Sequence, residues 1–317
     1  MPTPADTLYI GGGTPTVLGA DGLVEIVEQS KKSFTLEAAE ITVEANPADD
    51  LAETLARLRS AGVNRLSLGA QSAVDSELKI LSRRHNFEQV ASTVKAASSA
   101  GFDNISIDIM LGIPQQTPSS VAETVDRVLL LNPTHISAYM LKIEENTPFF
   151  KNKGLLNLPD DSCTAEMYLY VCDRLKKEGY EHYEISNFAR HGFRSRHNLK
   201  YWHCREYIGL GPAAHSFING RRCYYSRDVD GFIKNPVLLD DGEGCCCEEY
   251  LMLGLRLSDG VELSTLSRRF GAEFAQRVAK NAEKLKASRF LTMNGDKLCL
   301  TDEGFLLSNS IILRLLK

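Results

Sequence analysis

The sequence predicts an α/β protein built on a partial, open TIM-like barrel of parallel strands, with a C-terminal winged-helix-like domain. Short apolar runs alternate with amphipathic helical stretches over the first half of the chain. Each apolar run stops at glycines or at a polar side chain. The last part of the chain reads instead as helices followed by a hairpin. Alternation of strands and helices is typical of parallel sheets.

The first predicted strand, Leu8–Ile10, ends at Gly11-Gly12-Gly13-Thr14-Pro15-Thr16. Residues without a Cβ let a ligand approach the backbone closely and leave N–H groups open on one side. Such a turn beside a helix N-terminus suits a carboxylate or a phosphate. An ordinary strand-to-helix turn is the alternative for this stretch alone.

The next elements follow in order along the chain. Strands are expected at 41–43, 65–68, 105–110 and 135–141, and helices at about 22–34, 74–81 and 87–100. A further helix carries the apolar stripe Leu51, Leu55 and Leu58, with Asp49 or Asp50 as its N-terminal cap.

Glycines or polar residues lie at or near the C-terminal end of four of the predicted strands. They are Gly11–Gly13, Glu44, Gln71 and Asp108. The carboxyl ends of parallel strands meet at one rim, which is where α/β barrels place their sites. Asp108 interrupts an apolar run, where a carboxylate is costly unless it is satisfied. Two acids and an amide around a glycine turn suit a polar ligand, although each acid alone could cap a helix or pair with an arginine.

Composition narrows the function classes. The chain has 317 residues and a formal net charge of −5, so no overall field favours nucleic acid. No apolar run is long enough to span a bilayer, and the N-terminus does not resemble a signal peptide, so we expect a cytoplasmic protein. None of the eight cysteines forms a C-x-x-C pair, and we expect Cys245-Cys246-Cys247 to be small buried residues, with no metal site.

The second half has a different character. A helix is expected over 163–179, and residues 180–225 are rich in aromatic and basic side chains. An exposed linker is expected at 240–244, before helices at about 248–257, 263–270 and 273–287. Two strands flanking Asn294-Gly295-Asp296 complete the chain as a hairpin. The predicted domains are therefore 1–150, 151–240 and 245–317, the last with a lid or docking role.

Five ordered motifs resemble those of the radical S-adenosylmethionine family of oxygen-independent coproporphyrinogen III oxidases. They are Gly11–Thr16 (GGGTPT), Val43–Pro47 (VEANP), Ser67–Ser72 (SLGAQS), Leu81–His85 (LSRRH) and Asp108–Pro114 (DIMLGIP). Within that family, residues 197–202 (HNLKYW) are similar to the HNxxYW signature of the HemW-type haem chaperones. The resemblance extends over essentially the whole chain.

This resemblance implies a set of residues that bind S-adenosylmethionine. Gly12, Gly13 and Thr14 would hold the amino-acid end of the cofactor, and Glu44, Gln71 and Asp108 match the acid, the amide and the aspartate of the family. Arg83 matches the arginine that meets the cofactor carboxylate, with Arg84 as the alternative one position on. A zwitterion needs N–H donors and an arginine for its carboxylate, and acids for its ammonium group and ribose hydroxyls.

The sequence departs from the family at the iron–sulfur cluster. The family holds a [4Fe–4S] cluster with C-x3-C-x2-C, after a strand that precedes the glycine turn. None of the eight cysteines here has that spacing. We expect this chain to lack that first strand and cluster loop, as a truncated sequence would, and Leu8–Ile10 to form an open sheet edge.

The resemblance also implies haem as a ligand. We expect His197 to be the axial ligand of the haem iron, with His203 and His215 as alternatives. Tyr201 and Trp202 would form an aromatic wall of the haem pocket, and Asn198 completes the motif. Arg194, Arg196 or Lys200 would meet the propionates. A solvated basic loop with a structural histidine is the alternative.

The predicted partners are haem or a porphyrin and the proteins that accept haem, with no nucleic acid, no transmembrane segment and a homodimer as an open alternative. The alternative function is oxidative decarboxylation of coproporphyrinogen III, against which HNxxYW argues; no catalytic residue is assigned. A third alternative is a chain that does neither and fails to fold.

Overall fold

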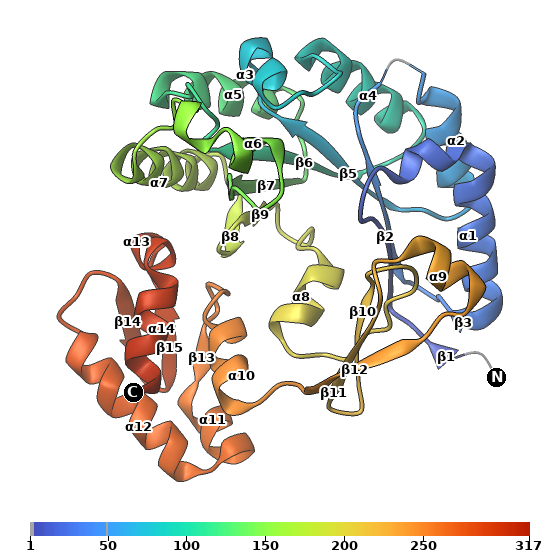
Figure 1. Cartoon of the computed structure of the whole chain (residues 1–317). Helices are drawn as coiled ribbons and strands as arrows, with labels where there is room; N and C mark the ends of the chain where they lie inside the picture. Colours follow the sequence, from blue (N-terminus) through green and yellow to red (C-terminus); the bar gives the residue numbers. More distant parts are fainter. Residues whose placement is uncertain (1–2, 49) are drawn as a thin grey trace. The chain divides into compact units, whose positions relative to one another are not determined.

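The computed structural model describes residues 3–48 and 50–317, and the chain divides into two compact units, Met1–His197 and Asn198–Lys317 (Figure 1). The first unit therefore extends past residue 150, the predicted end of the barrel domain. The residues from 151 to 240 contribute to both units. Each unit is described by itself below.

A curled sheet of seven strands forms the first unit, in the order β2-β4-β5-β6-β7-β9-β8 (Figure 1). The strands are β2 (Thr7–Ile10), β4 (Glu40–Ala45), β5 (Arg65–Gln71), β6 (Asn104–Leu111), β7 (His135–Met140), β8 (Glu181–Glu184) and β9 (Asn187–Ala189). Pairing is parallel from β2 to β7 and antiparallel at β7–β9 and β9–β8. The edge strands β2 and β8 do not pair, so the barrel is open, as the sequence predicts.

The helices of this unit lie along the outer face of the sheet (Figure 1). They are α1 (Gly19–Ser33), α2 (Ala52–Ser60), α3 (Asp75–Ile80), α4 (Phe87–Ser99), α5 (Pro118–Leu130), α6 (Pro148–Lys151) and α7 (Asp161–Lys177). Short 3-10 turns occupy Pro15–Leu18 and Lys153–Leu155, and the two-residue strands β1 (Thr3–Pro4) and β3 (Phe34–Thr35) pair in parallel. Helix α1 packs beside α2, α2 beside α4, and α5 beside α7.

Side-chain caps begin at least three of these helices, and Asp160 caps α7 by accepting the Cys163 N–H. Asn86 and Gln89 form a reciprocal capping box at α4, and Thr117 and Ser120 form one at α5. Asp50 does not cap α2, because Leu51 occupies the N-cap position; Asp49, the other predicted cap, lies outside the described residues.

Strand β5 shows why the interior of the sheet is polar. All seven of its residues are buried. Because side chains alternate along a strand, Leu66 and Leu68 share one face and Arg65 and Ser67 share the other. Ser67 contacts Asp108 of β6, which places the polar face toward the inside of the curl. Apolar residues therefore pack against the helices, and polar ones line the interior.

The second unit contains two three-stranded sheets. The first is antiparallel, in the order β10-β11-β12, with β10 (His215–Ile218), β11 (Arg221–Tyr225) and β12 (Leu238–Glu243), accompanied by α9 (Val229–Lys234). Most of the predicted linker at 240–244 is therefore strand; it pairs with β11 although its side chains are largely exposed. Helix α8 (Arg196–Trp202) precedes this sheet.

The C-terminal elements follow the predicted order of three helices and a hairpin. They are α10 (Cys247–Gly254), β13 (Val261–Glu262), α11 (Leu263–Phe270), α12 (Ala272–Leu285), β14 (Leu291–Asn294), β15 (Lys297–Leu300), α13 (Asp302–Leu306) and α14 (Ser308–Leu316). Gly295 takes a φ of 62° in the hairpin turn. Strand β13 and helices α13 and α14 are additional to the predicted elements.

The cysteine triplet is not buried, contrary to prediction. Cys246 is exposed and accepts the Glu249 N–H as the N-cap of α10, and Cys245 and Cys247 are half-buried. Among the described residues, no helix combines the length and apolar character that crossing a bilayer requires.

Candidate functional site

Strand register brings the predicted rim residues to one edge of the first unit's sheet. Ile10 pairs with Val43, Glu44 with Ser67, and Gly69 with Asp108. Each strand therefore ends beside its neighbour's end. The glycine turn, Glu44, Gln71 and Asp108 come from four adjacent parallel strands.

The glycine turn is tied to Glu44. The Tyr9 hydroxyl donates to Glu44 Oε1 at 2.6 Å, and the Gly12 N–H donates to Oε2 at 3.2 Å. Gly12 and Gly13 have φ values of 89° and 158°. A Cβ on Gly11 would lie 2.6 Å from the Tyr9 ring and 2.7 Å from Glu44 Cδ, so only glycine fits there. The open backbone of Gly12 and Gly13, with nothing within 4 Å of an added Cβ, leaves room for a ligand.

Asn46 connects this turn to Arg83. Its Nδ2 donates to Thr14 Oγ1 at 2.9 Å, and Arg83 Nη1 donates to its Oδ1 at 3.5 Å. Arg84 is exposed, whereas Arg83 is half-buried. The structure therefore brings Arg83, and not Arg84, beside the glycine turn.

Gln71 is held at the end of β5 by Tyr139. Gln71 has a φ of 69°, and its Oε1 accepts the Tyr139 hydroxyl at 2.8 Å. Burial, with the charge of Asp108, raises the pKa of Tyr139 to about 12, so the phenol stays a donor. Because Tyr139 occupies the amide oxygen, the Gln71 NH2 group remains the part that can donate to a ligand.

Asp108 is half-buried on β6. Ser67 and Ser106 donate to its Oδ1, each at 3.4 Å. Burial, reinforced by the charge of Glu44, raises the pKa of Asp108 to about 6, against the lowering effect of its Ser137 hydrogen bond. Perturbed acids of this kind are typical of ligand sites.

A buried chain of hydrogen bonds runs from Asp108 across the interior of the sheet. Ser106 Oγ lies 2.7 Å from His135 Nδ1, and His135 Nε2 lies 2.8 Å from the Tyr183 hydroxyl. The Ser195 N–H donates to that hydroxyl at 3.3 Å. Burial lowers the pKa of His135 well below its usual value, so its imidazole is neutral. No sequence motif marks these interior polar positions, and Tyr9, Asn46 and Tyr139 are not among the predicted site residues, although Asn46 lies within the VEANP motif.

The arrangement at the rim can bind an amino-acid zwitterion. Arg83 and the open backbone of the glycine turn offer donors to a carboxylate, and Glu44 and Asp108 offer acceptors to an ammonium group or hydroxyls. The predicted S-adenosylmethionine residues thus lie together.

His197 lies at the edge strand β2 of the same unit. Its Nδ1 is 2.9 Å from Thr7 Oγ1, and its ring stacks on Tyr9 with centroids 4.9 Å apart. The backbone N–H groups of Arg196 and His197 each donate to Glu40 at 3.0 Å. The motif histidine is therefore held at the start of α8 next to the open edge of the sheet.

The other motif residues continue along α8. Asn198 is half-buried, and Tyr201 meets Tyr207 edge to face at 4.7 Å. The Arg256 guanidinium lies 4.5 Å from the centre of the Trp202 ring. Within the described part of the chain, the buried Trp202 Nε1 has no hydrogen-bond partner.

A cavity of about 240 Å³ in the second unit adjoins this motif. It is lined by Tyr201, Cys204, Arg205, Tyr207, Phe217, Arg222, Glu249 and Leu253.

The two alternative haem ligands, His203 and His215, lie on different elements. His203 follows α8 directly, and the His215 ring stacks on Tyr224 of β11 with ring centroids 5.1 Å apart.

Two of the cations expected to meet propionates have protein partners. Arg194 Nε donates to Glu181 Oε2 at 2.9 Å, and Arg196 Nη1 donates to the Ala38 carbonyl at 2.9 Å. Lys200 lies on α8 and is half-buried.

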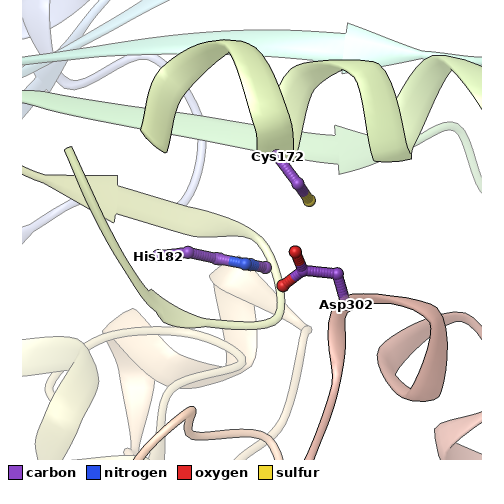
Figure 2. A group of neighbouring side chains, drawn as sticks. All are labelled: Cys172, His182 and Asp302. Carbon is purple, nitrogen blue, oxygen red and sulfur yellow. The ribbon is translucent and has the colours of Figure 1, made fainter. Parts of the chain in front are cut away.

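Two side chains of metal-binding type are buried in the first unit. Figure 2 shows Cys172 on α7 and His182 on β8; Asp302, also drawn there, belongs to α13 of the second unit. His182 stacks on Phe188 with ring centroids 4.2 Å apart. Structural metal sites use about four protein ligands, and two side chains of one unit do not make one.

Comparison with known proteins agrees with this geometry. Residues 3–128 match the Radical SAM superfamily, and residues 247–307 match the HemN C-terminal domain. The chain is 36% identical over 316 residues to the heme chaperone HemW of Lactococcus lactis, covering 96% of this chain and 83% of that protein. It is 35% identical over 317 residues to the heme chaperone HemW of Bacillus subtilis, covering 96% and 84%.

A solved structure shares the fold. It is that of coproporphyrinogen III oxidase (HemN) from Escherichia coli, a radical SAM enzyme, with a TM-score of 0.82. The match covers 99% of this chain and 78% of that one at 22% identity. The motif residues lie at the strand ends of a matching fold, and these two HemW relatives are up to 36% identical over most of both chains. The chain therefore belongs to the HemW family of haem chaperones within the radical S-adenosylmethionine superfamily.

Proposed function

We propose that this chain binds haem and delivers it to haem-requiring proteins, and that it binds S-adenosylmethionine at the rim of its first unit. The observation that carries the cofactor proposal is the convergence of the glycine turn, Glu44 and Arg83. The haem proposal rests on HNxxYW and on the HemW relatives.

The rim fits S-adenosylmethionine by the chemistry of its donors. The open backbone at Gly12 and Gly13, with Thr14 beside them, would take the methionyl end, and Arg83 would meet its carboxylate. Glu44 and Asp108 would accept hydrogen bonds from the ammonium and ribose hydroxyl groups, and the Gln71 NH2 group would donate to an oxygen of the cofactor. Bound S-adenosylmethionine supplies radical chemistry in this superfamily only together with an iron–sulfur cluster.

The residues present do not fit the [4Fe–4S] cluster of the family. None of the eight cysteines has C-x3-C-x2-C spacing, and no three cysteines group together in the part of the chain that the structure describes. Cluster binding needs converging thiolates. We derive no step through a cluster for this chain.

The side chains of α8 are of the types that bind haem. His197 supplies an imidazole, Tyr201 and Trp202 supply aromatic surface, and the buried Trp202 Nε1 is a donor that lacks a partner among the described residues. Asn198 completes the motif. The contact of His197 with the edge strand β2 holds this imidazole at the margin of the sheet.

A haem titration followed by the Soret band tests the haem proposal. His197→Ala is expected to weaken binding and shift the spectrum, whereas His203→Ala and His215→Ala, the matched histidine controls, are expected to leave both unchanged. Transfer of haem from the loaded chain to an apo-haemoprotein tests delivery. An unchanged affinity and spectrum in His197→Ala would show that the ligand is elsewhere.

The oxidase alternative receives no specific support. The HemN likeness shows the fold alone, and the rim residues are common to both functions. The homodimer and the cytoplasmic location expected from the sequence stay predictions. Size-exclusion chromatography with and without haem tests the first.

A further inference from the structure

Tyr9 lies between the rim and the motif histidine. Its hydroxyl donates to Glu44 Oε1 at 2.6 Å, and its ring stacks on the His197 imidazole with centroids 4.9 Å apart and planes 21° from parallel. Burial, with the Glu44 charge, raises the pKa of Tyr9 far above its usual value, so it stays a donor. One side chain thus contacts the carboxylate proposed for S-adenosylmethionine and the imidazole proposed for haem.

The other contacts of His197 tie its position to the same strand. Its Nδ1 lies 2.9 Å from Oγ1 of Thr7, two residues before Tyr9 on β2. Its backbone N–H donates to Glu40 Oε1, and Glu40 pairs with Thr7 in the sheet. A displacement of Tyr9 therefore changes the surroundings of His197 directly.

A chain of hydrogen bonds also connects Asp108 to Ser195, which lies two residues before His197. A consistent donor direction runs from the Ser195 N–H to Tyr183, from the Tyr183 hydroxyl to His135 Nε2, from His135 Nδ1–H to Ser106, and from Ser106 to Asp108. This direction assigns the imidazole proton to Nδ1. Ser195 immediately precedes α8, which carries the motif. Asp108 is thus linked to the start of that helix by hydrogen bonds, and Glu44 is linked to it by the Tyr9 hydroxyl and the stacking of the Tyr9 ring on His197.

We propose that Tyr9 couples the two binding sites, so that S-adenosylmethionine at the rim and haem at His197 each raise the affinity for the other. This inference rests on the proposed function. A carboxylate has about four acceptor positions, and Tyr9 and Gly12 use two of those on Glu44, so ligand donors can join Tyr9 without displacing it. The first ligand then bears the cost of ordering the Tyr9–Glu44 pair, and the second ligand binds a pair already in place.

Linkage gives the coupling a quantitative signature. The factor by which saturating S-adenosylmethionine tightens haem binding must equal the factor by which haem tightens S-adenosylmethionine binding. For one partly buried hydrogen bond we expect a factor of about five, at the low end of typical couplings. Tyr9→Phe keeps the ring on His197 and removes the bond to Glu44, so the factor should fall toward one.

The experiment measures both affinities, haem by its Soret band and S-adenosylmethionine by calorimetry, each with and without the other ligand. Tyr9→Leu removes the ring as well and should also weaken haem binding itself. Tyr180→Phe is the matched control, because its buried hydroxyl donates to the Pro133 carbonyl, away from Glu44. Melting curves establish that each variant folds.

The outcomes separate the proposals. A factor of one, or mutual weakening, in the native chain overturns the coupling and leaves the proposed function standing. An unchanged factor in Tyr9→Phe, or an equal loss in Tyr180→Phe, overturns the role of Tyr9. A native chain that binds no haem overturns the proposed function, and this inference with it.

Discussion

Protonation of Asp108 is expected to control S-adenosylmethionine binding in the mildly acidic range. Burial raises the pKa of this carboxyl to about 6, and an acceptor for ribose hydroxyls or an ammonium group works best when it is ionised. The perturbation is therefore a change of pH, compared between the native chain and Asp108→Asn.

The magnitude follows from the titration. With the pKa near 6, about nine-tenths of Asp108 is ionised at pH 7 and about one-tenth at pH 5. If the ionised form binds and the neutral form does not, the affinity for S-adenosylmethionine falls roughly tenfold over that interval. Asp108→Asn should bind weakly at both pH values, with a flat profile.

Stability gives a second readout without ligand. The pKa of Asp108 is raised in the folded state, from 3.8 to about 6, so the folded state holds the proton more tightly than the unfolded state does. This group's contribution therefore falls as the pH rises from about 4 to 6, and above that range it costs about 3 kcal/mol. Asp108→Asn removes the cost, so the variant should gain stability relative to the native chain at pH 7 and lose that advantage near pH 4.

The assays are calorimetric titration with S-adenosylmethionine and urea unfolding, both across this pH range. Asp103→Asn, an exposed acid, is the control and should follow the native profile. A native affinity independent of pH between 5 and 7 would refute the reasoning about binding. Equal pH dependence of unfolding in the native chain and Asp108→Asn would refute the buried-charge argument.

Three further changes test other parts of the structure. Gly11→Ala puts a Cβ 2.6 Å from the Tyr9 ring and should weaken S-adenosylmethionine binding at least severalfold in a titration, whereas Gly154→Ala, with nothing within 4 Å, should not. Glu77 accepts hydrogen bonds from three side chains in the core, so Glu77→Ala should lower the free energy of unfolding in urea by about 3 kcal/mol, and a loss below 1 kcal/mol would contradict its role. Trp202→Phe removes an N–H that has no partner among the described residues and keeps a ring under the Arg256 guanidinium, so it should lower the melting temperature much less than Trp202→Ala does.

The parallel strands could be predicted from the sequence because most of their side chains are buried, which gives short apolar runs that end at turn residues. Strands near Leu8, Val43 and Leu68 read as apolar or alternating runs closed by turn residues. The strand-end residues could be named for the same reason, because parallel strands end on one side. Arg83 required the resemblance to a family, since nothing in its local sequence separates it from Arg84.

The misses have local causes. Strands β8 to β11 lie in a stretch rich in basic and aromatic residues, where pairing depends on distant partners and not on periodicity. Most of the stretch 240–244 forms a strand although its side chains are exposed, so no apolar pattern marks it. In the sequence Tyr9 resembles any apolar residue of a short strand, and only the folded structure shows that its hydroxyl donates to Glu44.

The two-faced character of β5 restricts how the sheet can assemble. Shifting this strand by one residue would turn the Arg65 guanidinium toward the helices and Leu66 and Leu68 toward Asp108. A charged group would then face apolar side chains, and apolar side chains would face a carboxylate. The two faces of β5 therefore disfavour misaligned strand pairings during folding. A chain in which Arg65 and Leu66 exchange places should fold poorly even though its composition is unchanged.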